Sequence, residues 1–231
     1  IFLLQFVSSH FIISVEARLE IVALGASALI AASFFLRERR QQYAMIIQGL
    51  GFGIWYLTLV SGTLYFKVFS MALGGASMTI VSLLFIVLAL KQNSRLMAIV
   101  GIIAGFITPV IAPNFINSSL SFLSYYFILN LVIISIAWFK AWRELNVIGF
   151  VFTFVFSAAW DGYLLPKDFL VNEVFLIVFF LLYLALPILY SSRQSVKLKG
   201  IVDSTMVFAM PLVVFGLQYS LLDHAAIKLA Y

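Results

Sequence analysis

The sequence predicts an all-α fold, a polytopic transmembrane helix bundle with about eight full spans and a partial span before them. Composition is the first observation behind this prediction. Of the 231 residues, 64% are hydrophobic and only 10% are charged, whereas a soluble domain carries about a quarter charged residues. So few charges cannot cover a water-facing surface, so we expect lipid to be the main solvent. The second observation is the length of the apolar runs, and the third is the placement of Lys and Arg.

Eight apolar segments are long enough to be considered as spans. A helix rises ~1.5 Å per residue and the apolar core of a bilayer is ~30 Å thick, so a span needs ~20 residues. Residues 1–15 are apolar but shorter, and we expect them to be the end of a helix. The polar loop 114–119 separates the fourth segment from the fifth. The predicted full spans are 21–36, 43–64, 70–90, 96–112, 120–139, 145–165, 172–190 and 201–222.

The basic residues alternate between the two sides that this count defines. If the Arg37–Arg40 loop is cytoplasmic, three further basic loops, Lys91–Arg95, Lys140–Arg143 and Arg193–Lys199, are cytoplasmic as well. Ten basic residues then lie inside and four outside, namely Arg18, Lys67, Lys167 and Lys228. This asymmetry is the positive-inside pattern of a multi-pass protein of the bacterial cytoplasmic (inner) membrane.

No low-complexity segment or internal repeat divides the chain, and the loops are too short for a soluble domain. We therefore expect residues 1–231 to form a single transmembrane helical domain. The chain opens without Met or a basic leader and ends at Lys228–Tyr231 without a natural stop. We expect it to be a piece of a longer protein.

Small residues recur at helical spacing in several spans. Gln48 lies beside Gly49 and Gly53 in the second span, and Gly101 and Gly105 are four residues apart in the fourth. Because lipid gives no hydrophobic drive for helix pairing, such faces favour close packing of helices. The alternative is helix backbone exposed to a ligand.

Prolines interrupt three spans and leave a backbone carbonyl without its helical donor. Pro109 frees the carbonyl of Gly105 in this way, next to Thr108. A freed carbonyl at membrane depth must find a partner or line a cavity. Broken helices near the midplane form binding sites in many transporters, so Thr108 and Pro109 are candidate site residues. Pro187 and Pro211 are the other two interruptions.

Polar residues form one stripe in the sixth span. Thr153, Ser157, Trp160 and Asp161 fall on one helical face with Gly149. This stripe is a candidate wall of an aqueous cleft, and the alternative is an interfacial Asp beside an anchoring Trp. Asn130 lies in the middle of the fifth span, one turn from Tyr126. An interhelical hydrogen bond is the favoured role for Asn130 and ligand binding is the alternative.

Several chemistries find no support in the sequence. The chain has no cysteine, so thiolate metal sites and cysteine nucleophiles are excluded. It shows no phosphate-binding loop, no dinucleotide fingerprint and no metalloprotease motif. We expect no cofactor, no metal and no nucleic-acid partner; the expected partners are the lipid bilayer and other membrane or envelope proteins.

A series of short phrases carries a family resemblance over residues 16–160. The phrases, in order, are EAR (16–18), RERR (37–40), QGLG (48–51), WYL (55–57), LALKQ (88–92), AGFITP (104–109), LN (129–130), WRELN (142–146) and GF with Thr153 (149–153). The chain resembles the DUF2339 family of large bacterial multi-pass membrane proteins. In the fourth span, where relatives often carry two adjacent glycines, this chain has Ala104 and Gly105. The resemblance implies a bacterial inner membrane and a helical fold, and it assigns no catalytic residue.

Three functional hypotheses follow. The leading one is a transporter-like or permease-like bundle for a small solute or an envelope precursor, with its site between the broken fourth span and the polar face of the sixth. The scarcity of buried charge counts against coupled transport. The rival is a structural or assembly scaffold of the envelope, and the third is a membrane-embedded enzyme acting on lipid-linked substrates with Asp161 as its acid.

Overall fold

The fold is known from a computed structural model of the chain, which describes residues 14–116, 118–140, 142–156, 169–193 and 201–229. All regular structure in these ranges is helical. The elements are α2 (Val15–Leu36), α3 (Gln41–Leu64), α4 (Met71–Gln92), α5 (Arg95–Ile111), the short 3₁₀ helix η1 (Pro113–Phe115), α6 (Ser119–Phe139), α7 (Arg143–Phe150), the π-helical turn η2 (Val151–Phe156), α9 (Phe169–Arg193) and α10 (Ile201–Leu229).

The eight predicted apolar segments all overlap these helices. Within the described residues, five helices are long and apolar enough to cross a membrane: α2, α3, α4, α6 and the Phe169–Leu186 part of α9. The described parts of the other three segments are shorter. α5 has 17 residues and contains Pro109. α7 gives way to η2 after Phe150, and Phe208–Leu222 is the stretch of α10 whose side chains the structure describes.

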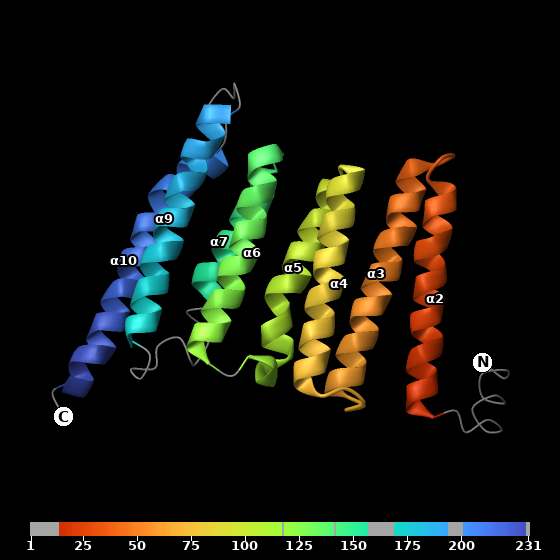
Figure 1. Ribbon diagram of the computed structural model, residues 1–231. Helices are drawn as coiled ribbons and strands as arrows, with labels where there is room; N and C mark the ends of the chain where they lie inside the picture. The colour runs from red at the N-terminus through yellow and green to blue at the C-terminus, as the bar shows by residue number, and fades with distance from the viewer. Residues whose placement is uncertain (1–13, 117, 141, 157–168, 194–200, 230–231) are drawn as a thin grey trace.

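The helices stand side by side in a row from α2 to α10 (Figure 1). The connections α2–α3, α4–α5 and α6–α7 lie at the upper end of this row, and α9 ends and α10 begins there too. The α3–α4 and α5–α6 connections lie at the opposite end. The upper end therefore collects the predicted basic loops, including Arg37, Arg39, Arg40 and Lys91, and we call it the basic end.

Local sequence explains the tight turn between α4 and α5. Asn93 adopts the left-handed conformation (φ 54°), and its N–H donates to the carbonyls of Ala89 and Leu90. Asparagine tolerates this conformation better than most residues with a side chain, so it ends α4 in the manner of a glycine cap. The turn returns the chain at once and lays Gly101 of α5 against Ile86 of α4.

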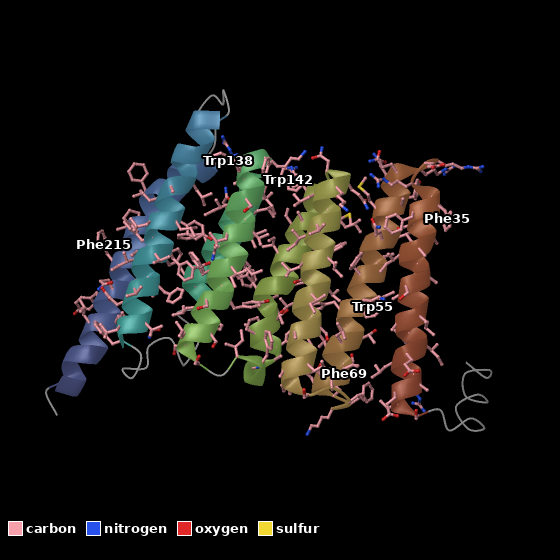
Figure 2. The ribbon with its side chains drawn as sticks, in the orientation of Figure 1. Phe35, Trp55, Phe69, Trp138, Trp142 and Phe215 are labelled. Atoms are coloured by element: carbon pink, nitrogen blue, oxygen red, sulfur yellow. The ribbon has the colours of Figure 1, made fainter. Side chains whose placement is uncertain are left out.

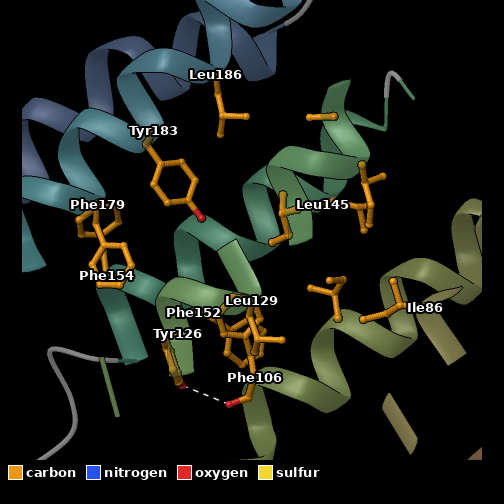
Figure 3. Packing of buried hydrophobic residues seen from close by; sticks show 14 of the residues in the cluster. Ile86, Phe106, Tyr126, Leu129, Leu145, Phe152, Phe154, Phe179, Tyr183 and Leu186 are labelled. Carbon is orange, nitrogen blue, oxygen red and sulfur yellow. Dashed lines mark hydrogen bonds between the residues drawn. The ribbon is translucent and has the colours of Figure 1, made fainter. Parts of the chain in front are cut away.

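The core lies between α5, α6, η2 and α9. Its largest side chains are aromatic, with Phe106, Tyr126, Phe154 and Phe179 all buried to 1% exposure or less. Figure 3 shows these rings meeting between helices that are far apart in the sequence. At the basic end, Trp138 and Trp142 lie at one level (Figure 2), as expected for tryptophans at a membrane–water interface.

Candidate functional site: a buried polar belt

The proline break in α5 is closed by tyrosine hydroxyls. Pro109 removes the N–H that would bond the Gly105 carbonyl, and the Tyr125 hydroxyl of α6 donates to that carbonyl at 2.7 Å. The neighbouring Tyr126 hydroxyl donates to the Phe106 carbonyl at 3.1 Å. The carbonyl predicted to need a partner therefore has one, and it comes from the next helix.

A third tyrosine bonds the neighbouring carbonyl of α5, from the α3 side. The Tyr56 hydroxyl of α3 donates to the Ala104 carbonyl at 2.9 Å and lies 3.0 Å from the Thr108 hydroxyl. Thr108 also donates to the Ala104 carbonyl at 2.8 Å and is fully buried. Three consecutive carbonyls of α5, at residues 104–106, thus accept hydrogen bonds from side chains of α3 and α6.

Asn130 is the second centre of polar contacts. Its Nδ2 donates to the Tyr126 carbonyl at 2.9 Å and to Thr153 Oγ1 at 2.7 Å. Its Oδ1 accepts from the Tyr183 hydroxyl of α9 at 2.5 Å. The interhelical role predicted for Asn130 is confirmed, because one amide joins α6, η2 and α9.

Gly149 makes room for this junction. A Cβ placed there would lie 2.5 Å from the Tyr183 hydroxyl and 3.2 Å from Asn130 Oδ1. Gly149 and Thr153 therefore do share a face, as the sequence predicted for the start of the stripe. The π-helical turn begins at Val151 and widens the helix beyond the 3.6 residues per turn that the prediction assumed.

These contacts join into one structure, which we call the polar belt: Tyr56, Thr108, Tyr125, Tyr126, Asn130, Thr153 and Tyr183. Tyr126 links its two centres, because its hydroxyl bonds α5 while its carbonyl accepts from Asn130 (Figure 3 draws the former bond). The belt runs sideways across α3, α5, α6, η2 and α9. None of its members is charged.

Aromatic rings fill the space beside the belt. Phe106 stacks on Phe152 with ring centroids 5.3 Å apart, which closes the region between α5 and η2 where the predicted ligand site would lie. Phe106 also meets the edge of Tyr126 at 5.0 Å. Within the described residues, the groove next to the belt is a small apolar one of about 160 Å³ between α3, α4 and α5, bordered by Tyr56 and Gly53.

The other predicted residues lie apart from the belt or pack against it. Gln48 is buried and accepts a hydrogen bond from Gln92, which ties α3 to α4. A Cβ at Gly101 would lie 2.8 Å from Ile86 Cγ1, and one at Gly105 would lie 3.4 Å from Leu129, so both glycines serve close packing. The belt brings together Thr108, Asn130 and Thr153. Ser157, Trp160 and Asp161 lie outside the described residues, and ligand binding by any of these positions stays a prediction.

Sequence reasoning missed Tyr56, Tyr125 and Tyr183. A signal for them was present, because a tyrosine inside an apolar span needs a partner for its hydroxyl.

At the basic end, Arg95 and Glu144 form an exposed ion pair at 2.6 Å that connects the starts of α5 and α7. In the part of the chain that the structure describes, no three His, Asp or Glu side chains gather as metal ligands would.

Apolar helices of membrane length, joined by buried uncharged hydrogen bonds, define the class: this is an integral, multi-pass α-helical membrane protein. The chain belongs to the family described as predicted membrane protein (DUF2339), whose model matches residues 1–231. No curated protein and no solved structure matches it.

Proposed function

We propose that the chain is a sealed, rigid helical unit of the bacterial inner membrane that scaffolds other envelope proteins. The polar belt is the observation that carries this proposal. Its hydroxyls and its amide bond one another or backbone carbonyls of α5 and α6, among them the Gly105 carbonyl that lacks a donor from Pro109, and aromatic rings pack beside them. A bundle held in this way resists the helix movements that a carrier needs, and its belt offers a solute no charge.

The same proposal includes sidedness, the number of crossings and a single domain. Eight helical segments cross the membrane, with α5, α7 and α10 completing their spans through flanking residues. The basic end faces the cytoplasm. Support comes from the distribution of ten basic residues against four and from the gathering of the described basic turns at one end (Figure 1).

A small-solute carrier is the second candidate, and one observation favours it. The π-helical turn η2 lies where Thr153 joins the belt, and π-helical turns often occur at functional sites. A carrier, or an enzyme that uses Asp161, should lose its function when Asp161→Asn is introduced at an unchanged expression level. A scaffold should tolerate this exchange.

Water accessibility separates the two candidates. The chain has no native cysteine, so the variants Thr153→Cys, Ser157→Cys and Asp161→Cys can each be labelled without background. Intact cells are treated with a membrane-impermeant maleimide. We expect Thr153→Cys to stay unlabelled until the protein is denatured, because a sealed belt excludes water. Labelling of Thr153→Cys in the native protein would overturn the scaffold proposal in favour of a carrier.

Two further variants serve as controls and test the sidedness. Lys67→Cys, in the exposed α3–α4 loop, should be labelled in intact cells. Arg39→Cys, in the exposed α2–α3 turn, should be labelled only in inverted vesicles. The reverse pattern would overturn the proposed orientation.

A further inference from the structure

A groove of about 220 Å³ lies between α9 and α10, away from the polar belt. One end of it is polar, formed by Glu173 and Gln218, and the remainder is apolar. The groove reaches the lipid-facing surface, since Ile177 is 48% exposed and Phe215 is 66% exposed (Figure 2 labels Phe215 on the outer side of α10). The apolar wall consists of Leu176, Ile177, Phe180, Val214 and Phe215.

One carboxylate oxygen of Glu173 has no partner among the described residues. Its Oε1 accepts a hydrogen bond from Gln218 Nε2 at 2.7 Å, and its Oε2 is buried without a hydrogen-bond partner among the described residues. The ion pair Arg95–Glu144 lies at the basic end, the opposite end of the helices from Glu173. A buried carboxylate oxygen without a donor is costly, and an ionisable residue within a membrane span generally marks a site.

The polar and apolar parts of the groove are ordered along the membrane normal. Glu173 lies one turn from the start of α9, at the end opposite the basic end, and Phe180 lies about 10 Å deeper along the helix. Gln218 and Val214 follow the same order on the antiparallel α10. The groove is therefore polar near the interface and apolar toward the bilayer centre, which is the polarity of a lipid molecule.

We propose that this groove binds an aminolipid of the bilayer, a phospholipid whose head carries a primary ammonium group. The ammonium has three N–H donors and a positive charge, so it can donate to the buried Oε2 of Glu173 and to the side-chain oxygen of Gln218. An acyl chain then lies along Ile177, Phe180 and Phe215. A choline head has no N–H to donate, and an anionic head is repelled by the carboxylate.

The proposal does not depend on the scaffold function, because the groove is separate from the belt. The test compares lipids that differ only in the head group. Purified full-length chain is stripped of lipid in detergent and equilibrated with equal amounts of phosphatidylethanolamine, phosphatidylcholine and phosphatidylglycerol with identical acyl chains. Lipid retained after gel filtration is then quantified by mass spectrometry.

We expect the wild-type chain to retain phosphatidylethanolamine at least about fivefold over the other two lipids, and Glu173→Gln to bring this ratio close to one. Ile177→Trp, which fills the groove, should lower retention without altering the charge. The matched controls are Glu144→Gln, an exposed carboxylate, and Leu181→Trp, an exposed position one turn farther along α9. Both controls should keep the wild-type ratio.

Three results would overturn the proposal. The first is equal retention of all three lipids by the wild-type chain, and the second is an unchanged ratio in Glu173→Gln. The third is displacement of bound phosphatidylethanolamine by soluble phosphoethanolamine as effectively as by added phosphatidylethanolamine. If Glu173→Gln does not fold, as judged by gel filtration and circular dichroism, the comparison of Ile177→Trp with Leu181→Trp decides. Equal lipid retention by these two variants would then also overturn the proposal.

Discussion

The centre of the row and its α2 edge are held together in different ways. In the centre, Asn130 bonds three partners on three elements and is 1% exposed. At the edge, α2 buries only Ala26 and Ser33, and one side-chain bond joins it to α3, from Trp55 Nε1 to the Ser27 hydroxyl at 2.9 Å. In lipid, neither region gains stability by burying apolar surface. Hydrogen bonds and close packing therefore determine how firmly each region is held.

Both regions have closely packed helices. At the edge, a Cβ on Gly51 would lie 2.6 Å from Ile30 Cγ1 and 3.0 Å from the Ala26 carbonyl oxygen. At the centre, Gly149 lets α7 approach Tyr183 just as closely. The regions differ in their polar contacts, and this difference predicts that the centre resists unfolding while α2 separates first.

The largest expected effect is that of Asn130→Leu. This exchange leaves the Tyr183 and Thr153 hydroxyls without their Asn130 partner in a buried place, and we expect it to lower the free energy of unfolding by about 2–4 kcal/mol. Unfolding in mixed micelles, followed by circular dichroism, measures it. The control is Ser135→Ala on the same helix, since Ser135 is exposed and donates only within α6. Equal effects of the two variants would show that the centre does not depend on Asn130.

Gly149→Ala tests the close packing that leaves room for the hydrogen bonds of Asn130. The added methyl group would overlap the Tyr183 hydroxyl and Ile133, so we expect a loss of about 1–3 kcal/mol. Gly25→Ala on α2 is the matched variant, because no atom lies within 4 Å of a Cβ there. It should be neutral or slightly stabilising, since alanine favours helix more than glycine does. A destabilising Gly25→Ala would mean that the outer face of α2 is covered.

Tyr125→Phe should cost about 1 kcal/mol, because it removes the hydroxyl that bonds the Gly105 carbonyl. A double-mutant cycle with Pro109→Ala sharpens the test. Alanine restores a backbone N–H that can bond the same carbonyl, so Tyr125→Phe should cost less in the Pro109→Ala background. Equal costs in both backgrounds would show that the hydroxyl does not compensate for the proline.

These contacts mark where sequence reasoning succeeded and where it ended. Apolar length located the helices, and the missing N–H of Pro109 identified the carbonyl that needed a donor. The donor itself could not be predicted, because Tyr125 meets Gly105 only through the rotation of α6 against α5, a long-range property of packing. The π-helical turn at Val151 could not be predicted either, since no local sequence pattern in α7 indicates it. The sixth predicted span therefore leaves the α-helical path where η2 begins.

Trp55→Phe should have the smallest effect, and it examines the edge. The exchange keeps an aromatic ring but removes the bond to Ser27, so we expect a loss of about 0.5 kcal/mol in global stability. This bond is a large part of the polar contact between α2 and α3. We therefore expect the stability of α2 to fall more than the stability of the whole protein. Hydrogen exchange should show α2 amides exchanging faster while α6 amides keep their protection. Equal acceleration in α2 and α6 would mean that the edge and the centre unfold as one unit, and that the contrast in their polar contacts has no consequence for the order in which helices separate.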